Sequence, residues 1–289
     1  MQKIHYLGPV GTFTEQAAKM FQNYLPNDYE LVPRRTLQDA ISSAVNDGLA
    51  VVPYYNLYEG LIQETLDCVT ECQLTIIAAQ RVPVCFAIGG IKFEPPVFSH
   101  QKALAQCSDY LKNKLPGCEQ TTTSSTSESA KLVAATKTGL AIARREALEQ
   151  NGLTVFADDI GNRQYGRANY TEFLLIGREK LLSADNHPNR TMIAVIPSVD
   201  RVGLLAEILG QIAFFGINLL KIHSRPALSD HSTQNAPQMF YLEMQTKTES
   251  KEFQLCRATL DLRLTLGNQT PKADGVVRLL GDYPLFAMP

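Results

Sequence analysis

The sequence predicts an α/β protein of two domains, the first of them with a mainly parallel sheet. Short apolar runs alternate with helical patterns along residues 3 to 155, which is the order of helices packed on a parallel sheet. After the turn-rich stretch REKLLSADNHPNR, a new strand-like run, TMIAVIP, begins a second alternation. With 289 residues, 45% of them hydrophobic, the chain is long enough to bury two cores.

The first domain opens with a strand, KIHYLG, and a helix, TFTEQAAKMFQNYL, whose Thr12 and Glu15 have the spacing of a capping box. A second helix, LQDAISSAVNDG, ends at Gly48, and the apolar strand LAVVPYY follows it. Further helices are predicted in GLIQETLDCVTEC, QKALAQCSDYLKN, STSESAKLVAATK and RREALEQNG, and further strands in LTIIAAQRVPVCFAIG, PPVFS and TGLAIA. In such a fold, the loops that follow the carboxyl ends of strands carry function.

The second domain is predicted to have the ferredoxin-like order βαββαβ. Its strands are TMIAVIP, INLLKIHSRPA, MFYLEMQ and VVRLLG, and its second helix is KEFQLCRATLDLRL. Such a sheet leaves a strand edge exposed, so we expect pairing with a second copy, as a homodimer or a homotetramer. Its first helix has apolar residues at helical spacing, at Leu204, Leu205, Ile208, Leu209, Ile212 and Phe215.

Two turn-rich segments are predicted to be irregular. A linker is expected near residues 178 to 190, and ALSDHSTQNAP is expected to be a mobile loop without chemistry. Side-chain hydrogen bonds and fixed φ angles compete with regular structure in the linker, at Asp185, Asn186, Pro188 and Asn189.

Composition argues against several functional classes. The net charge of −2 gives no electrostatic footprint for nucleic acid or for an anionic membrane. No stretch approaches the ~18 apolar residues that cross a bilayer, and MQKIHYLGPVG lacks the features of a secretion signal, so we expect a cytoplasmic protein. Cys68 and Cys72 have no His or Cys neighbours to complete a metal site. We expect neither a metal nor an organic cofactor.

Three loops open helices and are candidate anion sites: GPVGT at residues 8–12, YYNLYEG at 54–60 and SST at 124–126. Free backbone N–H groups and the helix dipole favour negative charge there, which indicates a small ligand with carboxylates. Most capped helix starts bind only their own cap, and that alternative stays open. The loop GPVG is not GxGxxG, so a dinucleotide is not favoured.

In their order along the chain, these motifs resemble the prephenate dehydratase family. The resemblance rests on YLGPVGTFTEQAA, VVPYYNLYEGLIQETLD, SHQKALAQC, STSESAKLVA, NYTEF and the later GLL and HSRP. It implies a two-lobed, periplasmic-binding-protein-like (type II) catalytic domain over residues 1–180, with lobes 1–77 plus 156–180 and 78–155. It also implies an ACT domain at residues 190–285, and a carbon–carbon or carbon–oxygen lyase that binds prephenate, a small dicarboxylate, between the lobes. The family's site residues carry over to Gly8, Pro9, Gly11, Thr12, Asn56, Leu57, Ser125, Thr126, Asn169, Thr171 and Phe173.

Two motifs depart from the family pattern. In its Thr-Arg-Phe triplet, Thr171 and Phe173 match, but Glu172 replaces the Arg. In its Val-Pro-Ile-Glu-Asn-Ser, Tyr54, Tyr55 and Leu57 replace Ile, Glu and Ser, so a hydroxyl that could hold a carboxylate has become apolar; Val52, Pro53 and Asn56 remain.

These departures favour a non-aromatising prephenate decarboxylase of specialised metabolism, which keeps the ring hydroxyl. Glu172 or His100 is the candidate proton donor, and Thr171 is kept for binding. Glu172 has two alternatives: it is protonated and faces the ligand, or it is ion-paired and points away. His100 could instead cap a helix. An ordinary dehydratase that serves phenylalanine synthesis, and a catalytically silent binding protein, are the alternative functions.

The resemblance implies an amino-acid effector at the ACT interface, but that motif departs as well. Phenylalanine-regulated members have Gly-Ala-Leu and Glu-Ser-Arg-Pro, where this chain has Gly203-Leu204-Leu205 and His223-Ser224-Arg225-Pro226. Leu204 is bulkier than the Ala and takes up space that an aromatic ligand requires. A structural, dimer-forming role is therefore expected over retained regulation. The positions concerned are Gly203, Leu204, Leu205, Asn218, His223, Ser224, Arg225 and Pro226.

Overall fold

The computed structural model describes residues 2–46, 48–163, 166–178, 187–198, 201–226, 237–266 and 275–286. The chain forms two compact units, the first of Met1–Thr65 and Gln80–Leu175 and the second of Leu66–Ala79 and Ile176–Phe286. The second unit thus includes residues 66–79, most of which the resemblance assigns to the first lobe. Most of the predicted linker and of the predicted loop ALSDHSTQNAP lies outside the described residues.

The first unit begins with a parallel sheet. Strand β1 (Gln2–Leu7) pairs in parallel with β2 (Tyr29–Arg34) and with β3 (Leu49–Asn56). The sheet order continues from β2, β1 and β3 to β11 (Tyr170–Gly177) and β5 (Thr75–Pro83), and both of these last strands run on into the second unit. Its helices and its short strand are α1 (Phe13–Gln22), α2 (Leu37–Asn46) and β4 (Gly60–Leu61), and α3 (Gln63–Glu71) begins in this unit and continues into the second.

A second, smaller sheet in the first unit has the order β10-β6-β9-β7-β8 and is mixed. Its centre pairs β6 with β9 in antiparallel and β7 with β9 in parallel, so the predicted mainly parallel arrangement does not extend to it. Strand β6 also pairs in antiparallel with β10, so it runs opposite to both of its neighbours. The strands are β6 (Ala87–Gly90), β7 (Val97–Ser99), β8 (Gln120–Thr122), β9 (Leu140–Ala143) and β10 (Thr154–Ala157).

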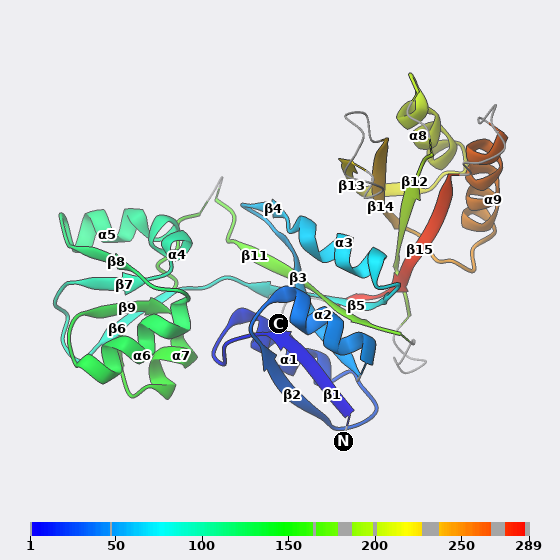
Figure 1. The fold of residues 1–289 in the computed structure, drawn as a ribbon. Helices are drawn as coiled ribbons and strands as arrows, with labels where there is room; N and C mark the ends of the chain where they lie inside the picture. The colour runs from blue at the N-terminus through cyan, green and yellow to red at the C-terminus, as the bar shows by residue number, and fades with distance from the viewer. Residues whose placement is uncertain are drawn as a thin grey trace. The chain divides into compact units, whose positions relative to one another are not determined.

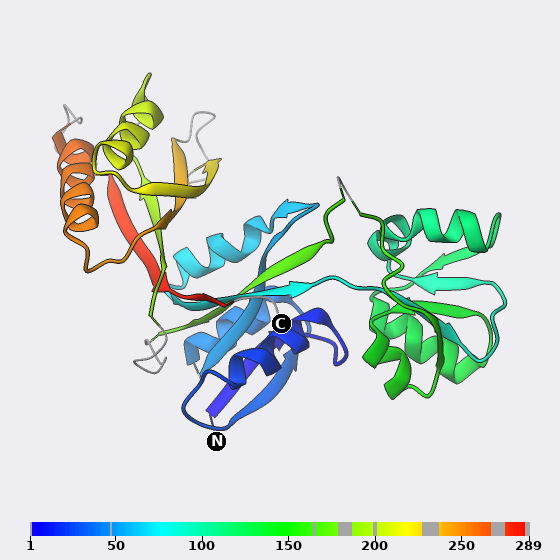
Figure 2. The same cartoon turned by 180° about the vertical axis from the view of Figure 1, so that it is seen from behind.

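Helices cover both faces of this smaller sheet, as Figure 1 and Figure 2 show. Successive residues of a strand point to opposite faces, and here Ile88 and Ile142 pack into one core while Ala87 and Ala141 pack into the other. The bulky face is covered by α4 (Gln101–Gln106) and α5 (Ser108–Lys114), and the alanine face by α6 (Thr126–Thr136) and α7 (Arg145–Gln150).

The second unit has the predicted order βαββαβ. Its four strands pair in antiparallel in the order β13-β14-β12-β15. Helix α8 and helix α9 pack on one face through a core that includes Leu204, Ile208 and Phe253. The elements are β12 (Arg190–Ile196), α8 (Leu204–Phe214), β13 (Asn218–Pro226), β14 (Gln238–Gln245), α9 (Lys251–Leu266) and β15 (Val276–Tyr283), and the short β16 (Leu285–Phe286) pairs with β5.

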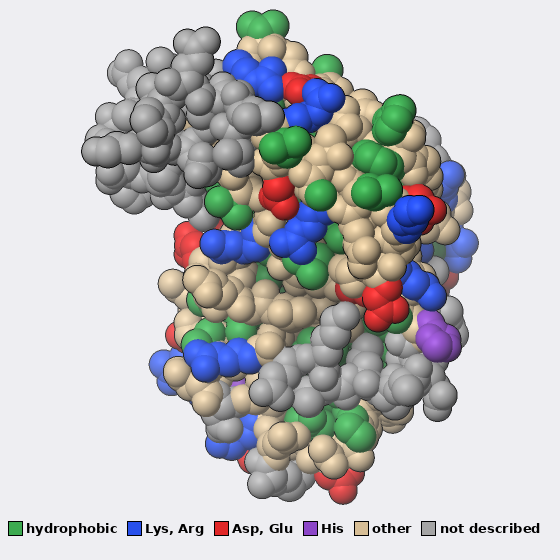
Figure 3. All heavy atoms as spheres, turned by 90° about the vertical axis from the view of Figure 1, so that its right-hand side faces the viewer, with side chains coloured by type: hydrophobic (Ala, Val, Ile, Leu, Met, Phe, Trp, Pro, Cys, Tyr) green, Lys and Arg blue, Asp and Glu red, His purple; other side chains and the backbone are tan. Residues whose placement is uncertain are grey.

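Charges of both signs are mixed on the surface. On the face in Figure 3, Lys and Arg side chains lie among Asp and Glu side chains, in line with the small net charge. Within the described parts of the chain, none of the helices has the length and apolarity needed to cross a membrane. The described residues also contain no group of three or more His, Cys, Asp or Glu side chains placed to hold a metal ion.

Candidate functional site

A pocket of about 320 Å³ in the first unit collects most of the predicted site residues. This volume is at the lower end of the range for small-molecule sites. Segments far apart in the sequence contribute to it, because its walls come from the loop before α1, the turn after β3, the starts of α4 and α6, and β11. The polar and charged side chains among its lining residues are Thr12, Thr14, Asn56, Glu59, His100, Lys102, Gln106, Ser124, Ser125, Thr126 and Thr171.

The structure brings together eight of the predicted residues: Gly8, Thr12, Asn56, His100, Ser125, Thr126, Thr171 and Phe173. The described residues that line the pocket do not include four of the other predicted ones, Pro9, Leu57, Asn169 and Glu172. Gly11 lines a separate hollow of about 250 Å³, beside Glu15 and Arg144. Several polar lining residues were not among the predicted site residues, including Glu59, Lys102 and Gln106.

The starts of α1 and α6 have the predicted caps. Thr12 Oγ1 accepts the N–H of Glu15 at 3.3 Å, and Ser125 Oγ accepts the N–H of Glu128 at 3.1 Å. Glu15 does not close a full capping box on Thr12, because its carboxylate accepts the N–H of Gly11 at 2.5 Å. Both helices thus point their positive ends at the pocket from capped, ordered starts.

Gly11 shapes the loop before α1. Its φ of +89° is in the region that favours glycine, and a Cβ at this position would lie 3.1 Å from Ser127 Oγ. Arg144 supports the same loop by donating to the Thr12 carbonyl at 3.0 Å, and its guanidinium lies 5.4 Å from the centre of the Phe13 ring. Burial lowers the pKa of Arg144, and Glu146 and Glu15 oppose that shift.

Asn56 connects the pocket wall to the turn after β3. Its Nδ2 donates to Thr171 Oγ1 at 2.9 Å, and both groups are buried. Its Oδ1 accepts the N–H groups of Tyr58 at 3.0 Å and Glu59 at 3.2 Å. Because Asn56 occupies an acceptor site of the Thr171 oxygen, the hydrogen of that hydroxyl is left to donate to a ligand.

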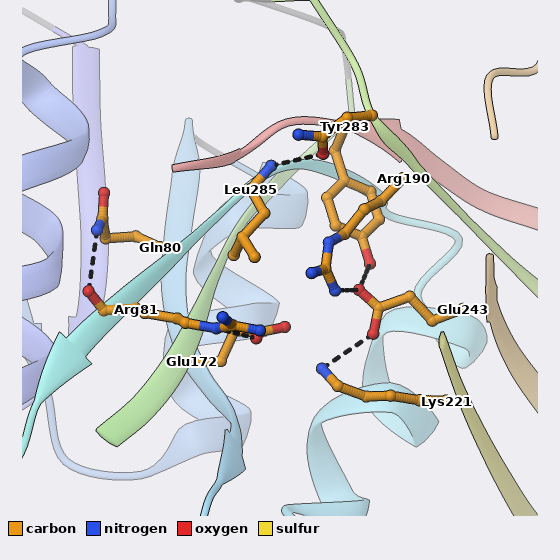
Figure 4. Close-up of polar contacts among 9 residues, drawn as sticks. Gln80, Arg81, Glu172, Arg190, Lys221, Glu243, Tyr283 and Leu285 are labelled. Carbon is orange, nitrogen blue, oxygen red and sulfur yellow. Dashed lines mark hydrogen bonds and ion pairs between the residues drawn. The ribbon is translucent and has the colours of Figure 1, made fainter. Parts of the chain in front are cut away.

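Strand β11 presents its residues alternately to the pocket and to the scaffold. Thr171 and Phe173 line the pocket, whereas Glu172 lies between them on the other side of the strand. Figure 4 shows Glu172 meeting Arg81, whose Nε lies 3.1 Å from Glu172 Oε2. The Glu172 side chain is fully buried, and the Arg81 guanidinium also lies 4.9 Å from the centre of the Tyr170 ring.

This placement contradicts the expectation that Glu172 donates a proton to the ligand. An ion-paired carboxylate on the far side of the strand has no path to a ligand in the pocket. The other alternative holds, an ion pair that points away from the ligand. The charge reversal relative to the family's Arg is balanced locally by Arg81, and it leaves the charge of the pocket unchanged.

His100 and Asn169 organise α4, which forms one wall. His100 caps the helix, because its Nδ1 accepts the N–H of Lys102 at 3.3 Å, so the ring hydrogen of the neutral form lies on Nε2. Asn169 Nδ2 donates to Gln106 Oε1 at 3.3 Å, and the backbone carbonyl of Asn169 accepts the N–H of Val84 at 2.9 Å. Asn169 thus supports the lining residue Gln106 from behind.

The predicted regulatory residues lie in the second unit. Leu204 is 6% exposed and belongs to the apolar core, and Gly203 precedes it with a φ of +83°. Leu205 packs against the same core. Along β13, Asn218 Nδ2 donates to Gln245 Oε1 at 3.1 Å, and Arg225 forms an ion pair with Asp67. The remaining positions, His223, Ser224 and Pro226, lie on the same strand.

A charged cluster lies on the sheet face that α8 and α9 do not cover. Glu243 Oε1 is 2.6 Å from Arg190 Nη1, and Glu243 Oε2 is 2.9 Å from Lys221 Nζ (Figure 4). The Tyr283 hydroxyl donates to the same carboxylate at 3.1 Å. Burial raises the pKa of Glu243, but the two cations outweigh it and the pKa is lowered. Burial lowers the pKa of His223, and Lys221 adds to that shift while Glu243 opposes it.

Comparison with known proteins gives consistent matches over the chain. Residues 4–181 match the family model described as prephenate dehydratase. The prephenate dehydratase of Methanocaldococcus jannaschii is 29% identical over 288 residues, which cover 97% of each chain. The prephenate dehydratase of Amycolatopsis methanolica is 36% identical over 237 residues, which cover 78% of this chain and 74% of that one.

Two solved structures extend the likeness to the second unit. The prephenate dehydratase from Arthrobacter aurescens in complex with L-Phe has a TM-score of 0.78 and 28% identity, and covers 98% of this chain and 89% of that one. A structure described as GqqA, a novel type of quorum quenching acylase, has a TM-score of 0.80 at 19% identity and covers 99% and 98%. At that identity the second match shows a shared fold alone.

Proposed function

The chain belongs to the prephenate dehydratase family, and we propose that it converts prephenate to phenylpyruvate, with loss of carbon dioxide and water. The observation that carries this proposal is the placement of Thr171 in the pocket, next to Asn56, with Glu172 turned away. The residue whose substitution favoured a different outcome, Glu172, does not line the pocket. With this activity, the protein is a lyase of aromatic amino acid biosynthesis.

The chemistry needs little more than a positioned hydroxyl. The bond from the ring carbon to its carboxylate breaks, its electron pair enters the ring, and the bond from the opposite ring carbon to the hydroxyl breaks. The departing hydroxide takes up a proton to leave as water. Thr171 supplies a hydrogen bond to that oxygen, and a preorganised donor stabilises charge that develops on a leaving group.

The two carboxylates of prephenate are matched by the positive ends of two helices. Helix α1 begins after Thr12 and helix α6 begins after Ser125, and both residues line the pocket. Backbone N–H groups at such ends favour anions. Phe173 is 2% exposed and also lines the pocket, and it supplies an apolar surface for the ring.

Incubation of the purified chain with prephenate tests the proposal. Phenylpyruvate, with its enol absorbance in alkali, is the expected product. A non-aromatic dihydro product that keeps the ring hydroxyl contradicts it, and so does tight binding without any product. In the last case the chain is a binding protein.

A non-aromatising decarboxylase is the second candidate function. The observation that favours it is the position of His100 in the pocket wall. This side chain lines the pocket, and with Nδ1 engaged at Lys102 the hydrogen of the neutral ring lies on Nε2, the atom that would donate a proton to the substrate. The exchange His100→Asn keeps a side chain able to cap α4 but removes the transferable proton. Loss of a dihydro product in that variant would support this candidate.

We infer that the second unit is an ACT-type domain with a structural role. Its βαββαβ order and antiparallel sheet support the assignment. Although the Arthrobacter relative was solved with L-Phe, Leu204 fills the core here and Arg225 pairs with Asp67. We expect the chain to form a homodimer, measured by light scattering. We also expect millimolar L-Phe to leave prephenate turnover unchanged, and inhibition by L-Phe would contradict this.

A further inference from the structure

We propose that Lys102 binds a carboxylate of the substrate and that Glu59 holds Lys102 in place when the pocket is empty. This inference rests on the proposed turnover of prephenate. Lys102 lies in the first turn of α4, and Glu59 lies in the turn between β3 and β4. Both side chains line the pocket, and they form an ion pair there.

The charge of the pocket points to this role. Among the described residues that line it, Lys102 is the only Lys or Arg and Glu59 is the only Asp or Glu. A substrate with two carboxylates requires positive charge, and the helix starts supply only partial charges. Lys102 is therefore the one full positive charge that the described pocket walls can direct at the substrate, and in the empty pocket Glu59 neutralises it.

The exposure of the pair makes an exchange of partners feasible. The Lys102 side chain is 64% exposed and that of Glu59 is 37% exposed. Water screens ion pairs at such sites, so they contribute little to stability. A substrate carboxylate can thus displace Glu59 from Lys102 without a large loss. The same Glu59 carboxylate, if it kept its position, would repel the incoming dianion.

The backbone of Glu59 is fixed even though its carboxylate is exposed. Asn56 Oδ1 accepts the Glu59 N–H, and Asn56 Nδ2 donates to Thr171. Lys102 is fixed in a similar way, because its N–H donates to His100 in the helix cap. The two ends of the ion pair are therefore anchored next to the groups that the reaction uses, and the long side chains are the parts that move.

Substitutions of Lys102 and of Glu59 should change the KM in opposite directions. This result would distinguish the proposal from an ion pair that only holds the pocket walls together. We expect Lys102→Met to raise the KM for prephenate roughly 2- to 5-fold, the value of an ion pair at a water-exposed site, with a much smaller change in kcat. We expect Glu59→Gln to lower KM roughly 2- to 10-fold, because it releases Lys102 and removes the repulsion. If the ion pair only held the pocket walls together, both substitutions would change the KM in the same direction.

The matched control is Lys112→Met, which removes the same charge from an exposed position on α5 outside the pocket. Its KM should equal that of the wild type. The double variant Lys102→Met, Glu59→Gln should have a KM above that of Glu59→Gln, because Lys102 is absent, and below that of Lys102→Met, because the repulsion by Glu59 is also removed. Added salt should raise the KM of the wild type and have little effect on that of Lys102→Met.

Calorimetric titration with prephenate separates this proposal from the proposed function. If the wild type binds prephenate but forms no product, the proposed turnover fails, and weaker binding by Lys102→Met still supports the role of Lys102. Equal binding by the wild type and Lys102→Met overturns that role. A wild type that does not bind prephenate at all overturns both.

Discussion

Asn56 donates its Nδ2 hydrogen to Thr171 Oγ1 across 2.9 Å, and both residues are buried against the pocket. One amide thereby fixes the direction in which the Thr171 hydroxyl can donate. The carbonyl end of the same amide holds the turn that carries Glu59. Asn56 therefore both orients the Thr171 hydroxyl and holds the turn that forms part of the pocket wall.

Replacement of Thr171 by Val should abolish most phenylpyruvate formation. The exchange keeps the branched shape but removes the donor, and loss of one such donor costs roughly 100- to 1,000-fold in kcat. Thr171→Ser keeps the donor and should retain much of the activity. Steady-state assays with prephenate measure both, with unchanged thermal unfolding as the control. Full activity in Thr171→Val would remove this hydroxyl from the reaction.

Replacement of Asn56 by Asp separates its two functions. An Asp carboxylate can still accept the N–H groups of Tyr58 and Glu59, so the turn should persist. It cannot donate to Thr171, and it would accept the Thr171 hydrogen instead, which withdraws that hydrogen from the substrate. We expect kcat to fall roughly 100-fold with little change in stability.

Asn56→Ala, by contrast, should lose both stability and activity, because the two turn N–H groups lose their partner. Asn46→Ala on α2, where the amide donates to an exposed carbonyl, is the matched control and should leave activity unchanged. If Asn56→Asp keeps wild-type kcat, the amide does not orient Thr171.

Introduction of Arg at position 172 should destabilise the fold without any gain in dehydration. The new guanidinium would lie beside Arg81 in a buried site, and breaking a buried ion pair in this way costs about 3–5 kcal/mol. The double variant Arg81→Glu, Glu172→Arg restores opposite charges and should recover much of the loss. Urea unfolding and product analysis measure the two effects. An increase in phenylpyruvate formation by Glu172→Arg alone would contradict the placement of this residue.

The stability of the second unit should fall in two steps as the pH decreases. The pKa of His223 is lowered in the folded chain, so the unfolded chain binds more protons below the ordinary value of 6.5 and stability decreases there. The pKa of Glu243 is also lowered, so a second decrease begins below its ordinary value of 4.5.

Calorimetric unfolding of the full chain at several pH values measures this dependence. His223→Gln should remove the first step and leave the second, because Gln does not titrate. Lys221 and Glu243 are the charged groups whose effects on His223 oppose each other. An unfolding temperature that rises on acidification through the first step would contradict the lowered pKa of His223.

Local patterns in the sequence predicted much of the fold and the core of the site. The capping residues Thr12 and Ser125 and the βαββαβ order depend on short-range spacing, and the structure has them. The meeting of Asn56 with Thr171, which are 115 residues apart, is consistent with motifs that the family resemblance placed in one site.

The direction of Glu172 could not be read from the sequence. A strand alternates its faces, but which face meets the pocket depends on how β11 lies in the sheet, and a partner such as Arg81 is 91 residues away. Lys102 and Glu59 were missed for a related reason. Each looks like an ordinary surface charge, and only the folded chain puts them on the same pocket.

The alternation along β11 has a consequence for how such chains diversify. The outer residues of the triplet, Thr171 and Phe173, line the pocket, whereas the middle residue, Glu172, pairs with Arg81 on the other side of the strand. An exchange of the charges at positions 172 and 81 would therefore leave the lining of the pocket unchanged. Sorting chains by the whole triplet would then separate enzymes that catalyse the same step.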